Sequence, residues 1–146
     1  MTGGRRACVF CAGDGGDLVW RDARLRVILA DEADYPGLAR VVWATHVVEM
    51  TDLDMADREH LMSVVWRVEA AQREALAPDK INLASFGNMT PHLHWHVIPR
   101  WRDDRHFPEP IWGRPAAGRD AEVAARAEAV RAALPAYRAA LLHLLG

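Results

Sequence analysis

Three histidines, His92, His94 and His96, alternate with apolar residues in the segment 91–100. Successive side chains of a β-strand point to opposite faces, so this spacing predicts three imidazoles on one face of a strand. The apolar residues between them would face the core. Seven histidines are present in 146 residues, and three of them fall within five positions, which favours a functional site.

Two kinds of chemistry are compatible with such a strand. A neutral imidazole is nucleophilic near pH 7 and can attack phosphorus while its neighbours fix its tautomer and bind phosphate oxygens. Imidazoles also bind metal ions, but His92 and His96 would lie roughly 13 Å apart along the strand. A pair such as His92 and His94 could share an ion with ligands from elsewhere. A plain solvent-facing strand is the third interpretation.

Cys8 and Cys11 form a Cys-x-x-Cys pair and are the two cysteines of the chain. No βαβ pattern of the thioredoxin type surrounds them, and two cysteines are too few for a disulfide-stapled scaffold. The pair is therefore interpreted as a candidate metal site.

Five short strands are predicted to position these residues. The first three are apolar runs bounded by polar and turn residues, and the last two flank the Gly87-Asn88 turn. They are expected at 17–21, 25–30, 40–44, 81–87 and 92–98. Residues 1–16, punctuated by glycine, are predicted to be turns.

Two helices complete the predicted fold. The first begins near Asp54, with Thr51 or Asp52 as its cap, and Pro78 limits its end. After a loop over 99–118, an Ala-rich helix starts at about Asp120, and Pro135 should kink or divide it. The sequence thus predicts one α+β domain built on an antiparallel sheet.

Composition restricts the function further. The 18 Lys and Arg residues against 20 Asp and Glu give a net charge of −2, which argues against a general nucleic-acid coat protein. No apolar run reaches the roughly 18 residues of a membrane span, and no apolar stretch follows the N-terminus as in a signal peptide. A cytoplasmic protein without membrane association is expected.

The segment His92-Leu-His-Trp-His-Val-Ile98 resembles the signature of the histidine triad (HIT) superfamily of nucleotide hydrolases and transferases. The resemblance extends over roughly 8–112 and includes Cys8-x-x-Cys11, Thr45-His46-Val47 and Gly87-Asn88. The segment 101–112 resembles a bacterial branch that is diadenosine-tetraphosphate-hydrolase-like. The resemblance to the superfamily implies a single HIT-like domain over 1–146, with a core at about 8–112 and a helical extension at about 119–146.

The resemblance also implies roles for individual residues. His94 would be the nucleophile, His96 would contact the phosphate or the bridging oxygen, and His92 would support the site. Asn88 and Thr90 would contact phosphate, and Asp31, after the second strand, would hold the ribose hydroxyls. The Ser or Thr that several branches place three residues before the triad is Met89 here, a departure that questions phosphoramidate cleavage.

Relatives in the superfamily bind structural zinc, and the residues carried over are Cys8, Cys11, His46 and His92. This Cys₂His₂ set suits tetrahedral zinc. The resemblance further implies a homodimer and no organic cofactor.

The expected activity is cleavage at the α-phosphate of nucleoside 5′-phosphoryl compounds through a covalent nucleotidyl-histidine. The compounds include dinucleoside polyphosphates, adenylylated small molecules and phosphoramidates. Two alternatives remain open. One is a zinc-dependent metallohydrolase whose triad binds the catalytic ion, and the other is a non-catalytic nucleotide-binding regulatory module.

Overall fold

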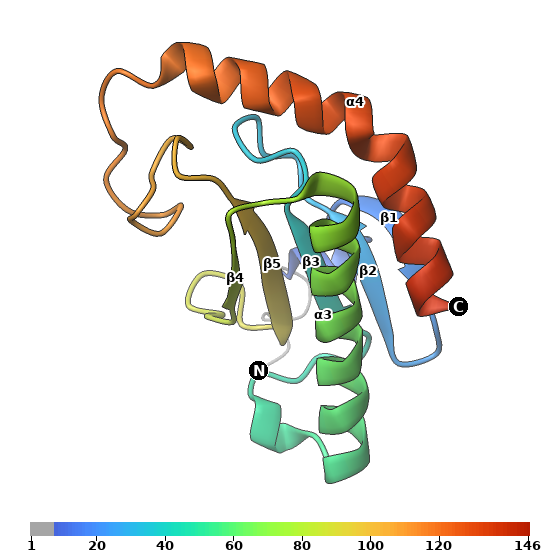
Figure 1. Ribbon diagram of the computed structural model, residues 1–146. Helices are drawn as coiled ribbons and strands as arrows, with labels where there is room; N and C mark the ends of the chain where they lie inside the picture. Colours follow the sequence, from blue (N-terminus) through green and yellow to red (C-terminus); the bar gives the residue numbers. More distant parts are fainter. Residues whose placement is uncertain (1–7) are drawn as a thin grey trace.

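The computed structural model describes residues 8–146 and shows one five-stranded antiparallel sheet in the order β1-β2-β3-β5-β4 (Figure 1). The strands are β1 (Asp17–Arg21), β2 (Leu25–Leu29), β3 (Ala39–Trp43), β4 (Lys80–Ala84) and β5 (His94–Arg100). The predicted α+β class with an antiparallel sheet of about five strands is therefore confirmed. Since β5 pairs with β3 on one side and β4 on the other, the histidine strand has no free edge.

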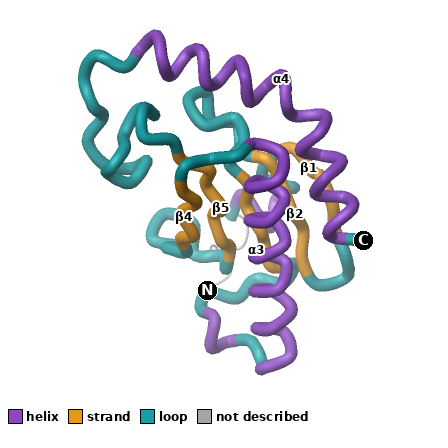
Figure 2. The backbone as a smooth tube through the Cα atoms, in the orientation of Figure 1, coloured by secondary structure: helices purple, strands orange, loops and turns teal. Residues whose placement is uncertain are grey.

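The helices lie on both faces of this sheet. The long helices α3 (Met55–Leu76) and α4 (Asp120–Leu145) cover one face, and the short α2 (Val9–Ala12) lies against the other (Figure 2). Among residues 8–146, no helix is long and apolar enough to cross a lipid bilayer.

The alternation of side chains in the sheet produces two different faces. Leu93 and Val97 belong to the large apolar core beneath α3 and α4. His94 pairs with Val42 and His96 with Arg40, and these four residues face α2 instead. The sequence pattern therefore predicted correctly which face of the strand the histidines occupy.

Several boundaries differ from the prediction. The fourth and fifth strands were expected at 81–87 and 92–98, but β4 ends at Ala84 and β5 begins only at His94. Ser85 leaves the ladder, and its hydroxyl donates to the His94 carbonyl (2.8 Å). Of the segment 1–16 expected to be turns, residues 1–7 lie outside the described part of the chain, and α2 occupies Val9–Ala12.

The cap of α3 was also predicted wrongly. Asp54 is the N-cap, and its carboxylate accepts a hydrogen bond from the Asp57 backbone. Thr51 and Asp52 lie one turn earlier, in a 3₁₀ helix over Met50–Asp52 whose N-cap is Glu49 and whose Asp52 carboxylate accepts from the Glu49 amide (2.9 Å). This additional turn shifts the start of α3 to Met55.

The C-terminal helix is continuous through Pro135 and bends along its course (Figure 1). It is therefore kinked and not divided. Beyond the bend, the buried Tyr137 hydroxyl donates to the Gly37 carbonyl (3.0 Å) and accepts from Gln72 of α3 (3.0 Å). The Gln72 amide also donates to the Val97 carbonyl (2.8 Å), so α3 is bonded directly to β5 and α4 is linked to it through Gln72.

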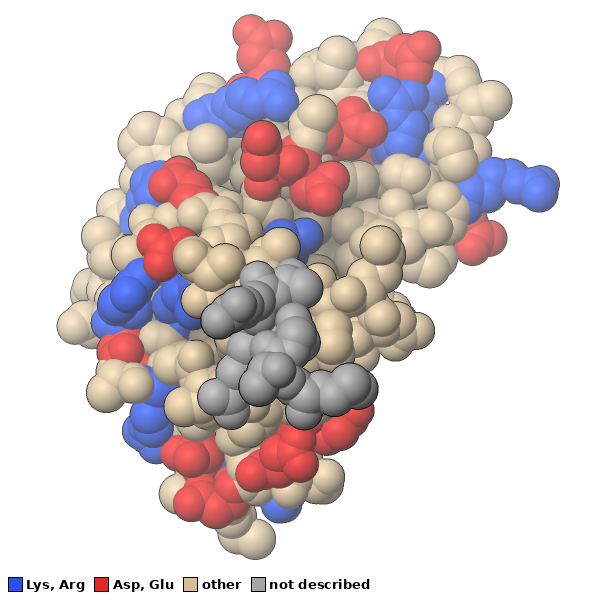
Figure 3. Space-filling view, turned by 180° about the vertical axis from the view of Figure 1, so that it is seen from behind, with Lys and Arg blue, Asp and Glu red and all other residues tan. Residues whose placement is uncertain are grey.

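The surface opposite to the view of Figure 1 carries interspersed acidic and basic side chains (Figure 3). In this view the basic residues do not gather into one continuous patch. This distribution agrees with the net charge of −2.

Candidate functional site

All three triad histidines are buried, but the structure gives them different positions. His92 precedes β5, whereas His94 and His96 lie in it. The His94 and His96 rings meet edge to face, with centroids 4.9 Å apart. His92 instead contacts the His46 ring, at 5.1 Å. The triad is thus split between two adjacent sites.

The tautomer of His94 is fixed by its backbone neighbour. Its Nδ1 donates to the His92 carbonyl at 2.6 Å, which leaves the lone pair on Nε2. Burial lowers the pKa of His94, and the positive charge of Arg40 acts in the same direction. His94 is therefore a neutral imidazole with an available nucleophilic nitrogen.

His96 is bonded to the cation beside it. Arg40 Nε donates to His96 Nδ1 (3.4 Å), so the proton of the neutral imidazole resides on Nε2. Burial, with smaller contributions from His94 and Arg40, lowers the pKa of His96 to about 3. At neutral pH His96 is a hydrogen-bond donor without a positive charge.

His94 and His96 open into a cavity of about 430 Å³. Among the described residues that line it, Arg40 carries the one positive charge and none is acidic. The lining comprises Val9, Phe10, Arg40, Phe86, Gly87, Asn88, Met89, Thr90, His94, His96 and Trp112. Neutral imidazoles beside a single cation provide a favourable setting for a phosphate group.

The predicted substrate contacts are placed differently relative to this cavity. Asn88 and Thr90 line it, in the loop between β4 and β5. Met89 also lines it, with a side chain that is 97% exposed. Asp31 is exposed just after β2 and is not part of the lining.

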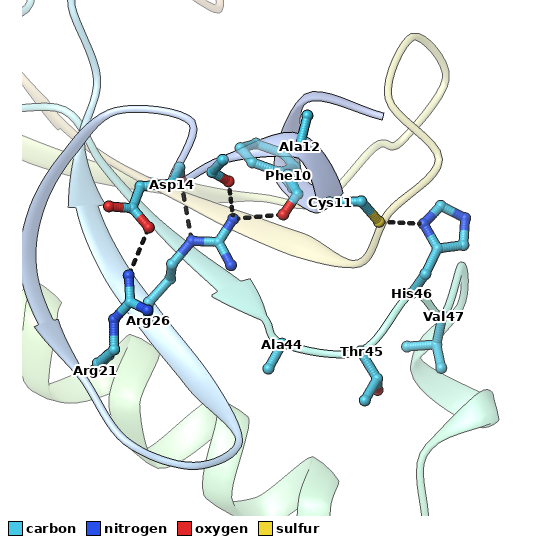
Figure 4. Close-up of a pocket in the computed structure, with 11 residues that line it drawn as sticks. Phe10, Cys11, Ala12, Asp14, Arg21, Arg26, Ala44, Thr45, His46 and Val47 are labelled. Carbon is cyan, nitrogen blue, oxygen red and sulfur yellow. Dashed lines mark hydrogen bonds and ion pairs between the residues drawn. The ribbon is translucent and has the colours of Figure 1, made fainter. Parts of the chain in front are cut away.

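Cys8, Cys11, His46 and His92 come together beside the triad cavity, from three separate segments of the chain. Their ligand atoms all lie within 4.8 Å of one another. Cys11 Sγ is 3.2 Å from His46 Nδ1 and 3.5 Å from His92 Nδ1, and Cys8 Sγ is 3.4 Å from His92 Nδ1. Figure 4 shows the Cys11–His46 pair at the rim of a hollow of about 800 Å³.

These four residues fit a tetrahedral zinc ion. Bonds of about 2.0–2.3 Å to zinc separate neighbouring ligand atoms by roughly 3.3–3.8 Å. The two distances to His92 fall in this range, and the Cys11–His46 distance of 3.2 Å lies just below it. His92 Nε2 donates to the Trp43 carbonyl at 2.6 Å, so its Nδ1 lone pair faces the two sulfur atoms. A histidine that binds zinc through one ring nitrogen typically donates a hydrogen bond from the other, which fixes the orientation of the ring. Both ring nitrogens of His92 are therefore engaged away from the triad cavity.

The short helix α2 connects the two sites. The Phe10 ring lies 4.8 Å from the His94 ring and 5.8 Å from that of His92. The guanidinium of Arg26, on β2, holds α2 in place by donating to the carbonyls of Phe10 (2.8 Å), Gly13 (3.0 Å) and Asp14 (3.0 Å) (Figure 4).

Sequence reasoning did not assign Phe10, Arg26, Arg40, Phe86 or Trp112 to the site. Each belongs to the site because segments that are distant in the sequence meet there, and the sequence carries no local signal for such a meeting. A usable signal existed for the two arginines. Both interrupt strands whose other residues are apolar, and a charge in a buried strand indicates a specific partner.

Comparison with known proteins agrees with this geometry. The sequence model of the HIT domain family matches residues 15–103. An uncharacterized HIT-like protein of Saccharolobus solfataricus is 27% identical over 106 residues, which cover 66% of this chain and 76% of that protein.

Solved structures give the same result. A histidine triad protein from Bradyrhizobium japonicum is 33% identical, covering 80% of this chain and 90% of that one, with a TM-score of 0.62. A zinc-bound histidine triad family protein from Mycobacterium smegmatis is 26% identical, covering 96% of both chains, with a TM-score of 0.62. The chain therefore belongs to the histidine triad (HIT) family, part of a superfamily of nucleotide-binding hydrolases and transferases.

Proposed function

We propose that this protein is a nucleotide hydrolase or nucleotidyl transferase that cleaves at the α-phosphate of nucleoside 5′-phosphoryl compounds. The observation that carries the proposal is the 2.6 Å hydrogen bond from His94 Nδ1 to the His92 carbonyl. It leaves Nε2 of a neutral, buried imidazole as a nucleophile in a cavity lined by Arg40 and His96. Dinucleoside polyphosphates, adenylylated small molecules and phosphoramidates are the candidate substrates.

The first step forms a bond between His94 Nε2 and the α-phosphorus and breaks the bond from phosphorus to the leaving group. The leaving group departs with the bonding electron pair. In the second step a water oxygen attacks the same phosphorus, the P–N bond breaks with its electron pair returning to His94 Nε2, and the water releases a proton to the solvent. The products are a nucleoside monophosphate and a regenerated neutral His94. Another acceptor in place of water gives nucleotidyl transfer.

His96 and Arg40 stabilise charge during both steps. His96 Nε2–H can donate to the bridging oxygen as negative charge develops there, and Arg40 offsets the charge of the phosphate. Because the pKa of His96 is about 3, this histidine donates a hydrogen bond and is not the source of a full proton. A phosphate leaving group is stable as an anion and needs no such proton, whereas the amine released from a phosphoramidate would take its proton from water.

The remaining substrate contacts are proposed from the family resemblance. Asn88 and Thr90 would bind phosphate oxygens, and their place in the cavity lining supports this role. Asp31 would accept hydrogen bonds from the ribose hydroxyls. Its exposed position after β2 leaves its carboxylate accessible to a nucleoside.

We propose that Cys8, Cys11, His46 and His92 hold a structural zinc ion. Zinc would fix the N-terminal segment against β5 and orient His92, whose carbonyl accepts from His94. His92 is thereby a positioning residue. The zinc-bound relative from Mycobacterium smegmatis supports this assignment.

The remaining proposals concern the whole protein. The chain would form one HIT-like domain, with its core at about 8–112 and its extension at about 119–146, and act in the cytoplasm as a homodimer. The bonds from Gln72 to Tyr137 and Val97 support including the extension in the domain. Light scattering of the purified protein tests the dimer, and a monomeric mass would overturn it.

The function is tested by intact mass spectrometry after brief incubation with diadenosine tetraphosphate. A nucleotidyl adduct is expected on the wild type. It accumulates further on His96→Ala if this substitution slows hydrolysis of the adduct more than its formation. His94→Ala should carry none, while the control His143→Ala, altered on the exposed part of α4, should behave as the wild type. An adduct on His94→Ala would overturn the assignment of the nucleophile.

The alternatives give different results in the same experiment. A metallohydrolase whose triad binds the ion would turn over substrate without an adduct and lose activity on chelation. A regulatory module would bind AMP with no turnover. Within residues 8–146, one group of three or more metal-ligating side chains converges, and it includes His92 but neither His94 nor His96. That arrangement favours the nucleophilic mechanism.

A further inference from the structure

Two aromatic side chains stand at the mouth of the triad cavity and remain largely in solvent. Phe86 follows β4 and is 62% exposed, and Trp112 lies in the loop after β5 and is 52% exposed. Their rings meet edge to face at 5.1 Å. Exposed aromatic side chains beside a polar site indicate a surface that can pack against a bound ligand.

The Trp112 ring is in direct contact with the site. It lies 5.0 Å from the His96 ring, at an interplanar angle of 70°. His96 is the residue proposed above to contact the bridging oxygen between the α-phosphate and the leaving group. A leaving group that extends beyond this oxygen therefore meets Trp112 and Phe86.

The order of the strands separates this aromatic pair from the nucleoside side of the site. Asp31 follows β2 and Arg40 lies on β3, both on one side of β5, and burial lowers the pKa of Arg40 there, although the negative charge of Glu32 raises it. Phe86 follows β4, at the other edge of the sheet. If the ribose of the attacked nucleotide is held near Asp31, the rest of the substrate therefore extends across the site toward β4.

The loop that carries Trp112 is held in place before any ligand binds. Arg100, which is buried, donates to the Glu109 carbonyl at 2.7 Å, and the Gly113 amide donates to the Pro110 carbonyl at 2.8 Å. Arg119 donates to the Phe107 carbonyl at 2.7 Å. A ring presented on such a loop loses little conformational entropy when it contacts a ligand.

We infer that Phe86 and Trp112 form a subsite for a planar ring on the leaving group, the second nucleobase of a dinucleoside polyphosphate. This inference rests on the proposed function, because the leaving group is defined by attack at the α-phosphate. Every nucleobase has a π-face, so the subsite selects for the presence of a base more than for its identity. The protein would then prefer dinucleoside over mononucleoside polyphosphates.

The test compares two substrates that transfer the same AMP. Diadenosine tetraphosphate releases ATP, whereas adenosine 5′-tetraphosphate releases triphosphate, which has no ring. The readout is the ratio of kcat/KM for the first substrate to that for the second. Trp112→Leu and Phe86→Leu should each lower this ratio by about tenfold, and Trp112→Phe should lower it less. Trp66→Leu, at an exposed tryptophan of α3 on the opposite face of the sheet, should leave the ratio unchanged.

A second measurement separates the subsite from the chemistry. Dissociation constants of the two compounds are measured by calorimetry with His94→Ala, alone and combined with Trp112→Leu. The dinucleotide should bind more tightly, and Trp112→Leu should remove most of this advantage. Equal losses for both compounds would overturn the subsite. Absence of turnover and adduct in the wild type would instead overturn the proposed function, and the ratio of affinities would still decide on the subsite.

Discussion

The phenyl ring of Phe10 packs against the imidazole of His94, with ring centroids 4.8 Å apart. Phe10 directly precedes Cys11, one of the four residues of the candidate zinc site. The proposed nucleophile and the candidate zinc site are therefore coupled through a single turn of helix. Any displacement of α2 changes the surface against which His94 is held.

Replacing Phe10 tests this coupling. Phe10→Ala should slow formation of the nucleotidyl adduct by about 10- to 100-fold, since small displacements of a reacting group have effects of this size. Phe10→Leu keeps most of the contact and should lose less. Rapid-quench kinetics measures the rate, and metal analysis should show unchanged zinc content in both variants. A wild-type rate in Phe10→Ala would refute the coupling.

Zinc content is the second prediction. The purified protein should hold about one zinc ion per chain, as expected for a closed four-ligand site. Cys8→Ser should lose the ion and unfold at lower temperature, because His92 and α2 lose their common anchor. Metal analysis with calorimetry checks both effects. His143→Gln, on the exposed part of α4, is the matched control and should retain zinc. Full zinc content in Cys8→Ser would exclude this ligand set.

Arg26 should stabilise the protein through its three hydrogen bonds to α2 and the loop after it. Arg26→Met should lower the free energy of unfolding by about 1–3 kcal/mol, since buried acceptors lose charged donors. Arg26→Lys should retain little of this stabilisation, because an ammonium group lacks the planar, forked donors of a guanidinium. Urea denaturation measures both. Arg67→Met, at an exposed arginine of α3, serves as the control and should change stability little.

Asp104 should be the anchor of the loop that presents Trp112. Its carboxylate, 4% exposed, pairs with the Arg100 guanidinium at 2.7 Å and accepts from the backbone amides of Trp101 and Phe107. Burial alone would raise the pKa of Asp104, but these hydrogen bonds outweigh burial and lower it.

Asp104→Asn should therefore destabilise the protein by about 3–5 kcal/mol, the range for breaking a buried ion pair. The neighbouring Asp103 offers a matched comparison, since its ion pair with Arg126 is partly exposed. Asp103→Asn should cost no more than about 1 kcal/mol. Thermal and urea unfolding of the two variants measures the difference, and equal effects would count against the anchor.

The pH dependence of stability should reveal His96. In the unfolded chain its imidazole binds a proton below about pH 6.5, whereas the folded protein holds its pKa at about 3. Its contribution to stability is thus complete above pH 6.5 and is lost as the pH falls toward 3. The loss is at most about 1.4 kcal/mol per pH unit from this group.

His96→Asn removes this group, so its free energy of unfolding should fall less steeply than that of the wild type between pH 6.5 and 4.5. Urea titrations at several pH values give the two slopes. Parallel slopes would show that His96 does not take up a proton on unfolding in this range.

The sequence predicted the parts of the fold that depend on local periodicity. Alternation around His94 placed the imidazoles on one face, and five strands with two long helices were expected. The ends of β4 and β5 were missed because Ser85 lies outside the ladder and His92 lies in a bend, where its amide donates to the Thr90 carbonyl. The cap of α3 was missed because three acidic residues, Asp52, Asp54 and Asp57, compete for this role within one short segment.

The candidate site was predicted only where a motif lies within a few residues. The convergence of Cys8 and Cys11 with His46 and His92 came from family resemblance, since their spacing in the sequence says nothing about their distance in space. Arg40 and Trp112 contact His96 across 56 and 16 positions, and no periodicity encodes such contacts.

The position of α4 has a consequence for how the protein is made. Leu141 and Leu145, at the very end of the described chain, are buried in the same apolar core as Leu25 and Val41 of the sheet. During translation the sheet strands leave the ribosome long before these residues do. The core stays open on one side until α4 has been synthesised, so packing of this face of the sheet is completed only after α4 has left the ribosome.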